Sequence, residues 1–228
     1  MSSEEFRGKP LAGDDSPRWV LGRLVRGTLG RLLLLAFRVR LHGRNNVPQS
    51  GAILAGNHVS YLDPAIIWSA IPRPAHFVGK VELWDTGWLG FLLDRFWVIP
   101  VKRDSADREM IQTASALLAA GDLLGMFPEG TRKRDLSSDE LGAAHGGVAF
   151  LAIRNSCPVV PVGIAGTEEA LPAGAKLPRF PRVAIVMGEP IDPAQFVGGR
   201  KERTEAMTQA IMERIAAARD EARRVRIS

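Results

Sequence analysis

Two side chains suited to proton transfer, His58 and Asp63, lie five residues apart in the chain. A carboxylate that binds one nitrogen of an imidazole fixes its tautomer and stabilises the cation formed when the other nitrogen takes a proton. The pair therefore suits general-base chemistry on a hydroxyl or a water. The alternative is that Asp63 only caps a helix and that His58 bonds the backbone of a loop. The spacing alone leaves both interpretations open.

The residues around this pair predict a strand, a turn and a helix. Residues 52–56 form a short apolar run of strand length, and Pro64 directly after Asp63 is typical of a helix start. On one continuous helix the two side chains would point about 140° apart, so a contact between them needs the turn. We therefore expect His58 in the loop and Asp63, as the N-cap, at the mouth of the helix.

Strands and helices alternate along the rest of the chain, which predicts a single α/β domain with a central, mostly parallel sheet flanked by helices. Sites in such sheets gather at the carboxyl ends of the strands. Lys80, Arg103 and residues 129–132 each follow a predicted strand, as His58 does, so we expect them to converge. The predicted strands are 39–42, 52–56, 76–79, 97–101, 123–127, 159–164 and 183–187, and the predicted helices are 64–70, 82–96, 105–120, 147–155 and 202–225.

The segment 18–41 predicts a basic amphipathic helix and a lead-in to the domain. It contains six arginines and no acidic residue. Such a helix, with Trp19 nearby, can lie in a membrane interface with its arginines on lipid phosphates. The alternative is an ordinary surface helix packed on the domain, but the absence of acids favours the membrane. The apolar residues at helical spacing are Leu21, Leu24, Val25, Leu32, Leu35 and Val39, and the arginines towards the other side are Arg23, Arg26, Arg31 and Arg38.

Composition narrows the classes of partner and compartment. The net charge of +5 and the pI near 9.9 favour anionic partners, but no zinc spacing, aromatic RNA-binding signature or long lysine run supports nucleic acid. The acidic, polar start is unlike a secretory signal, and no run of 18 apolar residues occurs. We therefore expect a cytoplasmic protein without a membrane-spanning helix. Cys157, the only cysteine, is expected to be a buried structural thiol.

Four blocks of residues occur in order along the chain, whereas the serine-hydrolase elbow, the Walker loop and the dinucleotide-binding glycine pattern are absent. The blocks are Asn57-His58-x4-Asp63, Lys80-Val81-Glu82-Leu83 through Arg103, Phe127-Pro128-Glu129-Gly130-Thr131-Arg132, and Val160-Pro161-Val162-Gly163-Ile164. The ordered set resembles the PlsC-like glycerolipid acyltransferases, whose best-known members are 1-acylglycerol-3-phosphate acyltransferases. The resemblance covers about residues 40–190.

This resemblance implies a role for each matching residue. His58 would be the base that takes the proton from the acceptor hydroxyl, and Asp63 would hold its other nitrogen. The acceptor's phosphate would be bound by Lys80, Arg103 and Arg132, and the pocket would be shaped by Asn57, Glu129, Gly130 and Thr131.

Simpler roles remain open for some of these residues. Glu129 can serve as a cap or as a partner of Arg132, and Arg103 as a surface charge at a strand end. The chain departs from the family where His145 stands before two glycines, because the family often has a lysine there. His145 can partly substitute for that lysine, but we expect it to be an exposed histidine in a mobile loop, residues 133–146.

The implied reaction moves a fatty acyl group from acyl-CoA, or from acyl carrier protein, to the sn-2 hydroxyl of 1-acylglycerol-3-phosphate (lysophosphatidic acid). The product would be phosphatidic acid for phospholipid biosynthesis. No cofactor and no metal are implied beyond the acyl donor. The expected partners are a lysolipid, acyl-CoA and an anionic membrane surface, at the cytoplasmic face of the cell membrane, with peripheral or monotopic attachment.

Alternative functions concern the acceptor and the chemistry. The acceptor can be glycerol-3-phosphate or another lysophospholipid, His58 can activate water in a thioesterase, or the protein can bind lipid at a membrane surface without chemistry. The expected organisation is a flexible polar N-terminus at 1–17, the amphipathic helix and lead-in at 18–41, the acyltransferase domain at 42–200, and a C-terminal helix packed on it at 201–228.

Overall fold

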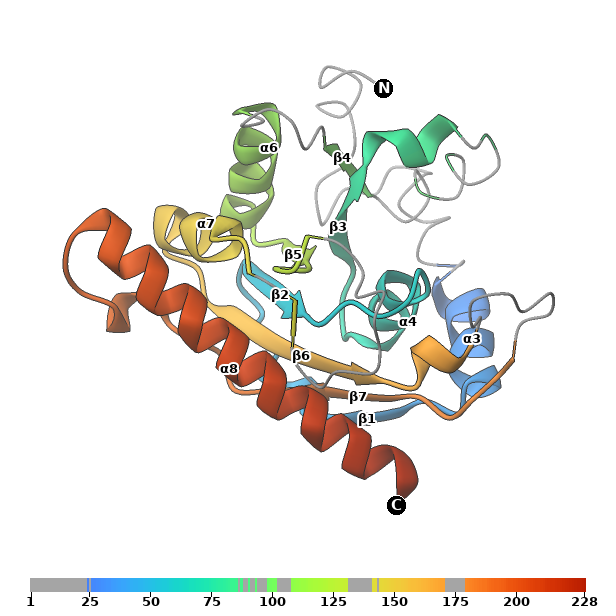
Figure 1. Ribbon diagram of the computed structural model, residues 1–228. Coiled ribbons are helices and arrows are strands. Elements are labelled where there is room, and N and C mark those ends of the chain that lie inside the picture. The colour runs from blue at the N-terminus through green and yellow to red at the C-terminus, as the bar shows by residue number, and fades with distance from the viewer. Residues whose placement is uncertain are drawn as a thin grey trace.

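A computed structural model describes residues 24, 26–85, 87, 90, 93, 98–101, 108–130, 141–142, 144–170 and 179–228 of the chain. Its centre is one seven-stranded sheet in the order β1-β7-β6-β2-β5-β3-β4 (Figure 1). The strands are β1 (Arg40–His42), β2 (Ala52–Gly56), β3 (Ala75–Lys80), β4 (Ile99–Val101), β5 (Leu123–Met126), β6 (Val159–Ala165) and β7 (Ala184–Met187). The α-helices are α3 (Arg31–Ala36), α4 (Asp63–Ala70), α6 (Arg108–Ala119), α7 (Gly147–Asn155) and α8 (Arg200–Ile227).

Five strands of the sheet run in the same direction. β6 pairs in parallel with β2, β2 with β5, β5 with β3, and β3 with β4. β7 is antiparallel to β6, and β1 is parallel to β7. The mostly parallel sheet predicted from the sequence is therefore confirmed. As a consequence, the carboxyl ends of β2, β3, β4, β5 and β6 meet at one edge, which is where parallel sheets build their sites.

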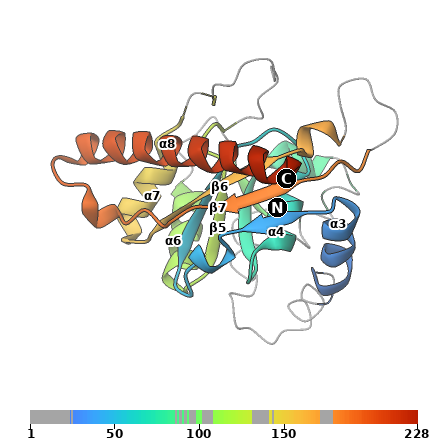
Figure 2. The same ribbon diagram turned by 90° about the horizontal axis from the view of Figure 1, so that it is seen from below.

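Helices cover both faces of the sheet, so most strands are buried on both sides. Figures 1 and 2 show α6, α7 and α8 on one face and α3 and α4 on the other. Side chains alternate between the two layers, as the twofold period of a strand requires. Leu54 of β2 packs in the cluster with α4, whereas its neighbours Ile53 and Ala55 pack in the cluster with α6, α7 and α8.

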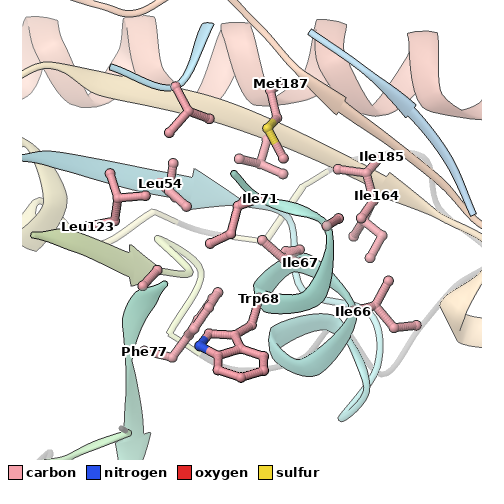
Figure 3. Packing of buried hydrophobic residues seen from close by; sticks show 14 of the residues in the cluster. Leu54, Ile66, Ile67, Trp68, Ile71, Phe77, Leu123, Ile164, Ile185 and Met187 are labelled. Carbon is pink, nitrogen blue, oxygen red and sulfur yellow. The ribbon is translucent and has the colours of Figure 1, made fainter. Parts of the chain in front are cut away.

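The α4 layer holds Trp68, the largest fully buried side chain among the described residues. In Figure 3, Ile66, Ile67 and Trp68 of α4, and Ile71 directly after it, lie among apolar side chains of the strands. All four are at most 2% exposed. Each such burial stabilises the fold by about 1.5–3 kcal/mol, so the N-terminus of α4 is held firmly in place.

On the other layer, the long helix α8 lies against the backbone of β6. A Cβ atom added at Gly163 would stand 2.1 Å from the backbone carbonyl carbon of Ala218. Only glycine therefore permits this close approach of helix and strand. Met207, Ile211 and Ile215 bury the apolar side of α8 in the cluster. The expected C-terminal helix at 202–225 is longer in the structure, from Arg200 to Ile227.

The other predicted elements correspond closely, but several extend into parts of the chain that the structure does not describe. The predicted helix 82–96 overlaps a 3-10 helix, Val81–Asp85, at its start. The predicted strand 97–101 is described from residue 98 and pairs from Ile99. The predicted helix start at 105, the predicted loop residues 133–140 and 143, and Trp19 lie outside the described residues.

The N-terminal segment forms a π-helical turn, Arg26–Gly30, followed by α3. Leu33 and Leu34 pack against the α4 layer of the core. Of the predicted apolar stripe, Leu24, Leu32 and Leu35 are 60%, 62% and 72% exposed, whereas Val39 packs against the core. Among the described residues, no helix has both the length and the hydropathy needed to span a membrane.

One arginine of this segment departs from the predicted membrane role. Arg26 donates hydrogen bonds to the carbonyl oxygens of Trp68 and Ile71, at the C-terminal end of α4. Its guanidinium also lies over the Trp68 ring, 5.7 Å from the centroid. Burial, together with the nearby charge of Arg44, lowers the pKa of Arg26 from its usual value. Arg26 therefore satisfies orphan carbonyls of a helix end and does not face lipid phosphates.

Candidate active site

The predicted contact between His58 and Asp63 is present. The Nδ1 atom of His58 lies 2.9 Å from Oδ2 of Asp63. His58 stands in the loop that leaves β2, and Asp63 is the first residue of α4. The turn between strand and helix therefore lets the two side chains meet, although on one continuous helix they would point in different directions. With the proton of the neutral ring on Nδ1, facing the carboxylate, the lone pair is on Nε2.

The predicted N-cap role of Asp63 is wrong. Leu62 holds the N-cap position, and α4 has no side-chain cap bond. The carboxylate of Asp63 points back into the preceding loop, where Oδ2 accepts the backbone N–H groups of Val59 at 2.8 Å and Ser60 at 2.7 Å. Asp63 thus shapes the loop that carries His58 as well as bonding its ring.

A residue that the sequence reasoning missed completes the surroundings of this carboxylate. The hydroxyl of Thr167 donates a hydrogen bond of 2.5 Å to Oδ1 of Asp63. Thr167 follows β6 and is fully buried. The available signal was its position: a polar residue two positions after a buried strand, at the sheet edge that also carries His58.

An aromatic ring packs against the face of the His58 imidazole. Phe127, which follows β5, stacks on the imidazole with a centroid distance of 4.1 Å and an interplanar angle of 15°. The side chain of His58 is 16% exposed, and Nε2 has no hydrogen-bond partner among the described residues. The ring is thus fixed at Nδ1 and by its face, while Nε2 is left for another molecule.

Glu129 connects two loops at this edge. Its Oε1 accepts the backbone N–H of His58 at 3.1 Å, and its Oε2 accepts the backbone N–H of Gly142 at 2.8 Å. Glu129 is 6% exposed, and a buried carboxylate with two backbone donors is adequately satisfied. The carboxylate of Glu129 therefore positions the backbone of His58. This role is more specific than the cap or the pairing with Arg132 expected from the sequence.

Asn57 holds the other side of the same loop. Its amide accepts the N–H of Ile164 at 2.8 Å and donates to the carbonyl oxygen of the same residue at 3.0 Å. The side chain thereby extends the pairing of β2 with β6 beyond Gly56 and Val162, the last paired residues. Asn57 is 1% exposed, so it supports the loop of His58 from the protein interior.

Gly130 and His145 lie against each other. Gly130 has a positive φ of 64°, and a Cβ atom there would stand 2.9 Å from Cδ2 of the His145 ring. Both the turn and the close approach therefore require glycine. The backbone N–H of His145 donates to the carbonyl oxygen of Pro128. His145 is exposed, as predicted, and it lies next to the Glu129-Gly130 turn.

Of the three predicted phosphate-binding cations, Lys80 is the one that the structure describes. Lys80 is the last residue of β3 and is exposed at the same edge as His58. Arg103, Thr131 and Arg132 lie outside the described residues. In the described part of the chain, no group of three or more His, Cys, Asp or Glu side chains is arranged to hold a metal ion.

Comparison with known proteins identifies the family of this chain. The family model described as Acyltransferase matches residues 38–165, more than half of the chain. A 1-acyl-sn-glycerol-3-phosphate acyltransferase of Bacillus subtilis is 30% identical over 187 residues, which cover 81% of this chain and 89% of the relative. A lyso-ornithine lipid O-acyltransferase of Pseudomonas aeruginosa is 30% identical over 152 residues, which cover 66% of this chain and 56% of the relative.

A solved structure agrees with the fold. The crystal structure of PlsC, a 1-acyl-sn-glycerophosphate acyltransferase from Thermotoga maritima, aligns with a TM-score of 0.67 over 88% of this chain and 82% of that chain, at 23% identity. The family match spans the strand and loops that carry His58, Asp63 and Glu129. The chain belongs to the PlsC-like acyltransferase family, and it is an acyltransferase.

Proposed function

We propose that this acyltransferase transfers a fatty acyl group from a thioester donor, acyl-CoA or acyl carrier protein, to the sn-2 hydroxyl of 1-acylglycerol-3-phosphate. The observation that carries the proposal is the 2.9 Å contact of His58 with Asp63, which directs Nε2 away from the carboxylate. The name of the Bacillus subtilis relative supports the acceptor. The product would be phosphatidic acid.

The proposed chemistry needs one base and no covalent intermediate. Nε2 of His58 takes the proton of the acceptor hydroxyl while the oxygen attacks the thioester carbonyl. The tetrahedral intermediate then expels the thiolate of the donor, which takes the proton back from the imidazolium. Asp63, buried and bonded to Nδ1, stabilises the imidazolium between these steps. Because the thioester is already activated, orientation of the hydroxyl is the main remaining task.

Replacement of the proposed base tests this function directly. We expect His58→Ala to lower kcat for thiol release with lysophosphatidic acid at least about 100-fold, because a positioned base contributes two to four orders of magnitude. The assay follows the free thiol from one acyl-CoA with and without added acceptor. His42→Ala is the matched control, since His42 is exposed at the end of β1 and should leave kcat unchanged.

Two results would contradict the proposal. His58→Ala that keeps more than a few per cent of the wild-type rate, with an unchanged circular dichroism spectrum, would show that His58 is not the base. Thiol release that does not depend on an acceptor would indicate a thioesterase instead.

For the acceptor's phosphate, we propose Lys80 together with Arg103 and Arg132. A hydrogen bond between a cation and a phosphate contributes about 1.5–3 kcal/mol. Lys80 is the described member of this set, exposed at the carboxyl end of β3. This role depends on charge, so it is separable from the chemical step.

The expected effect of removing Lys80 is on binding. Lys80→Ala should raise KM for lysophosphatidic acid about tenfold or more and should leave KM for the acyl donor unchanged. An equal rise in KM for both substrates, or none for lysophosphatidic acid, would argue against phosphate binding by Lys80.

A second acceptor deserves a test because one relative that is 30% identical is a lyso-ornithine lipid O-acyltransferase. The discriminating experiment compares kcat/KM for lysophosphatidic acid, lyso-ornithine lipid and glycerol-3-phosphate with one acyl-CoA. We expect lysophosphatidic acid to be preferred and Lys80→Ala to reduce that preference. A higher kcat/KM for lyso-ornithine lipid would replace the proposed acceptor and leave the proposed base in place.

We also propose that the N-terminal segment attaches the enzyme to an anionic membrane surface, at the cytoplasmic face. The outer side of the segment carries the exposed residues Leu24, Leu29, Leu32 and Leu35, with Arg31 exposed beside them. Four large apolar side chains turned towards solvent, on a segment without acids, suit insertion between lipid headgroups. Charge placed on this side should release the protein from anionic vesicles.

A further inference from the structure

Thr167 and Asp63 form a hydrogen bond that has no part in the proton transfer proposed for His58. The two residues are 104 positions apart, and both are 0% exposed. The O···O distance of 2.5 Å is in the range of a hydroxyl that donates to an ionised carboxylate. Such bonds are stronger than those between neutral groups. Thr167 also lies two residues beyond the family match, which ends at residue 165.

The donors to Asp63 divide unevenly between its two oxygens. Oδ2 accepts from the ring of His58 and from the backbone of Val59 and Ser60. All three donors belong to one short loop, so they move together with it. Oδ1 accepts from Thr167, which stands on a different part of the sheet. Among the described residues, Thr167 alone therefore ties the carboxylate of Asp63 to the end of β6.

The hydroxyl of Thr167 is placed by a turn that only glycine allows. Gly166, directly after β6, has a φ of +102°, and a Cβ atom there would stand 2.3 Å from the carbonyl oxygen of Arg182. The turn leads into a short 3-10 helix, Thr167–Glu169. Arg226, near the end of α8, bonds the carboxylate of Glu169 and the carbonyl oxygen of Arg182. The position of Thr167 is thus fixed on two sides.

We propose that Thr167 is a positioning residue that acts on His58 through Asp63, which rests on the proposed role of His58 as the base. Its hydroxyl sets the plane of the carboxylate, and the carboxylate sets the direction in which Nε2 of His58 points. Without that hydroxyl, the carboxylate keeps its three loop donors but is free to rotate about them. The consequence is a misdirected base in a correctly folded protein.

Substitutions at residue 167 that differ in donor capacity test this role. Thr167→Val keeps the shape and removes the donor, and we expect kcat to fall about 10- to 100-fold while KM for both substrates changes less than about twofold. Thr167→Ser restores the donor and should return kcat to near the wild-type value. Thr208→Val is the matched control, because the Thr208 hydroxyl bonds a backbone carbonyl within α8.

A spectroscopic measurement separates positioning from stability. In protein labelled with ¹⁵N at histidine, and assigned with the His58→Ala variant, the Nδ1–H resonance of His58 should shift in Thr167→Val and return in Thr167→Ser. Thr208→Val should leave it unchanged. A general loss of stability would not shift the resonance in Thr167→Val, restore it in Thr167→Ser and leave it unchanged in Thr208→Val. If Thr167→Val fails to fold, Thr167→Cys, a weaker donor of similar size, replaces it and should give an intermediate kcat.

The outcomes distinguish this inference from the proposed function. If His58→Ala abolishes transfer but Thr167→Val folds and keeps kcat within about threefold of wild type, the positioning role is wrong and the base remains. A Thr167→Ser variant as defective as Thr167→Val, or an unmoved His58 resonance, would also overturn it. If His58→Ala keeps its activity, the proposed function itself falls.

Discussion

At the scale of single residues, buried polar side chains in this site bond the backbone of neighbouring loops. Asp63 accepts two backbone N–H groups, Glu129 accepts two more, and Asn57 pairs with both polar groups of Ile164. A buried polar group without a partner costs more than its bond contributes. These residues therefore hold the loops in one arrangement, and the same bonds that orient His58 also stabilise the fold.

This double role predicts a double effect for Asp63→Asn. The amide brings one NH₂ group and no charge to a place that faces four donors, so the imidazolium loses its stabilising partner. We expect kcat to fall at least about 100-fold and the free energy of unfolding to fall by about 1–3 kcal/mol. Thiol release and urea denaturation measure the two effects.

The matched control for this change is Asp192→Asn. Asp192 is an exposed cap of the 3-10 helix Pro193–Gln195 and accepts the N–H of Ala194. Asparagine caps a helix about as well as aspartate, so neither kcat nor stability should change. If Asp63→Asn were equally silent, Asp63 would have no role beyond filling space.

At the scale of elements, the segment from Arg26 to Phe37 has two sides with different tasks. Its inner side belongs to the core, because Phe37 is 2% exposed and Leu33 and Leu34 pack against the α4 layer. Arg26 also bonds the end of α4, the helix that begins with Asp63. Deleting this segment would therefore damage the core and obscure any effect on membrane binding.

Single charges on the outer side give a clean test of membrane attachment. Leu35→Glu places an anion at a residue that is 72% exposed, so the fold should tolerate it. We expect co-sedimentation with anionic vesicles to weaken at least about tenfold, from lost apolar burial and from charge repulsion. Far-UV circular dichroism should be unchanged.

Val197→Glu separates this effect from the change in net charge. Val197 is 83% exposed in the turn before α8, and the substitution adds the same negative charge there. Vesicle binding should stay close to that of the wild type. Equal weakening by both substitutions would assign the effect to net charge and contradict insertion of the α3 side.

At the scale of the whole molecule, the parallel strands bring distant parts of the chain to one edge while the two helix layers exclude water from the sheet. Cys157, two residues before β6, is 5% exposed and belongs to the buried cluster of the α8 layer. Burial raises the pKa of its thiol from 9.0 to about 11. The predicted burial of Cys157 is therefore confirmed.

The raised pKa of Cys157 predicts a defined dependence of stability on pH. The unfolded chain releases the thiol proton near pH 9, whereas the folded protein keeps it until about pH 11. Unfolding therefore becomes easier as the pH rises through this window, and the stabilisation is fully present below pH 9. Urea denaturation at pH 8 and pH 10.5 should show a larger loss of stability for the wild type than for Cys157→Ala. Parallel losses in the two proteins would contradict it.

The sequence by itself determined the elements and the local part of the site. Apolar runs bounded by turn residues predicted the strands, and Asp63-Pro64 predicted a helix close enough for His58 to reach the carboxylate. These signals lie within short windows, where side-chain periodicity and helix-start chemistry act. The resemblance of four ordered blocks added the family, which the comparisons confirm.

Only the tertiary structure decided what surrounds that pair. The bond of Thr167 to Asp63, the pairing of Asn57 with Ile164, and the inward turn of Arg26 all join residues far apart in the chain. Such contacts depend on strand order and register, and on which side of a helix meets the core. Those are set by the packing of all the layers at once, so no short stretch of sequence contains them.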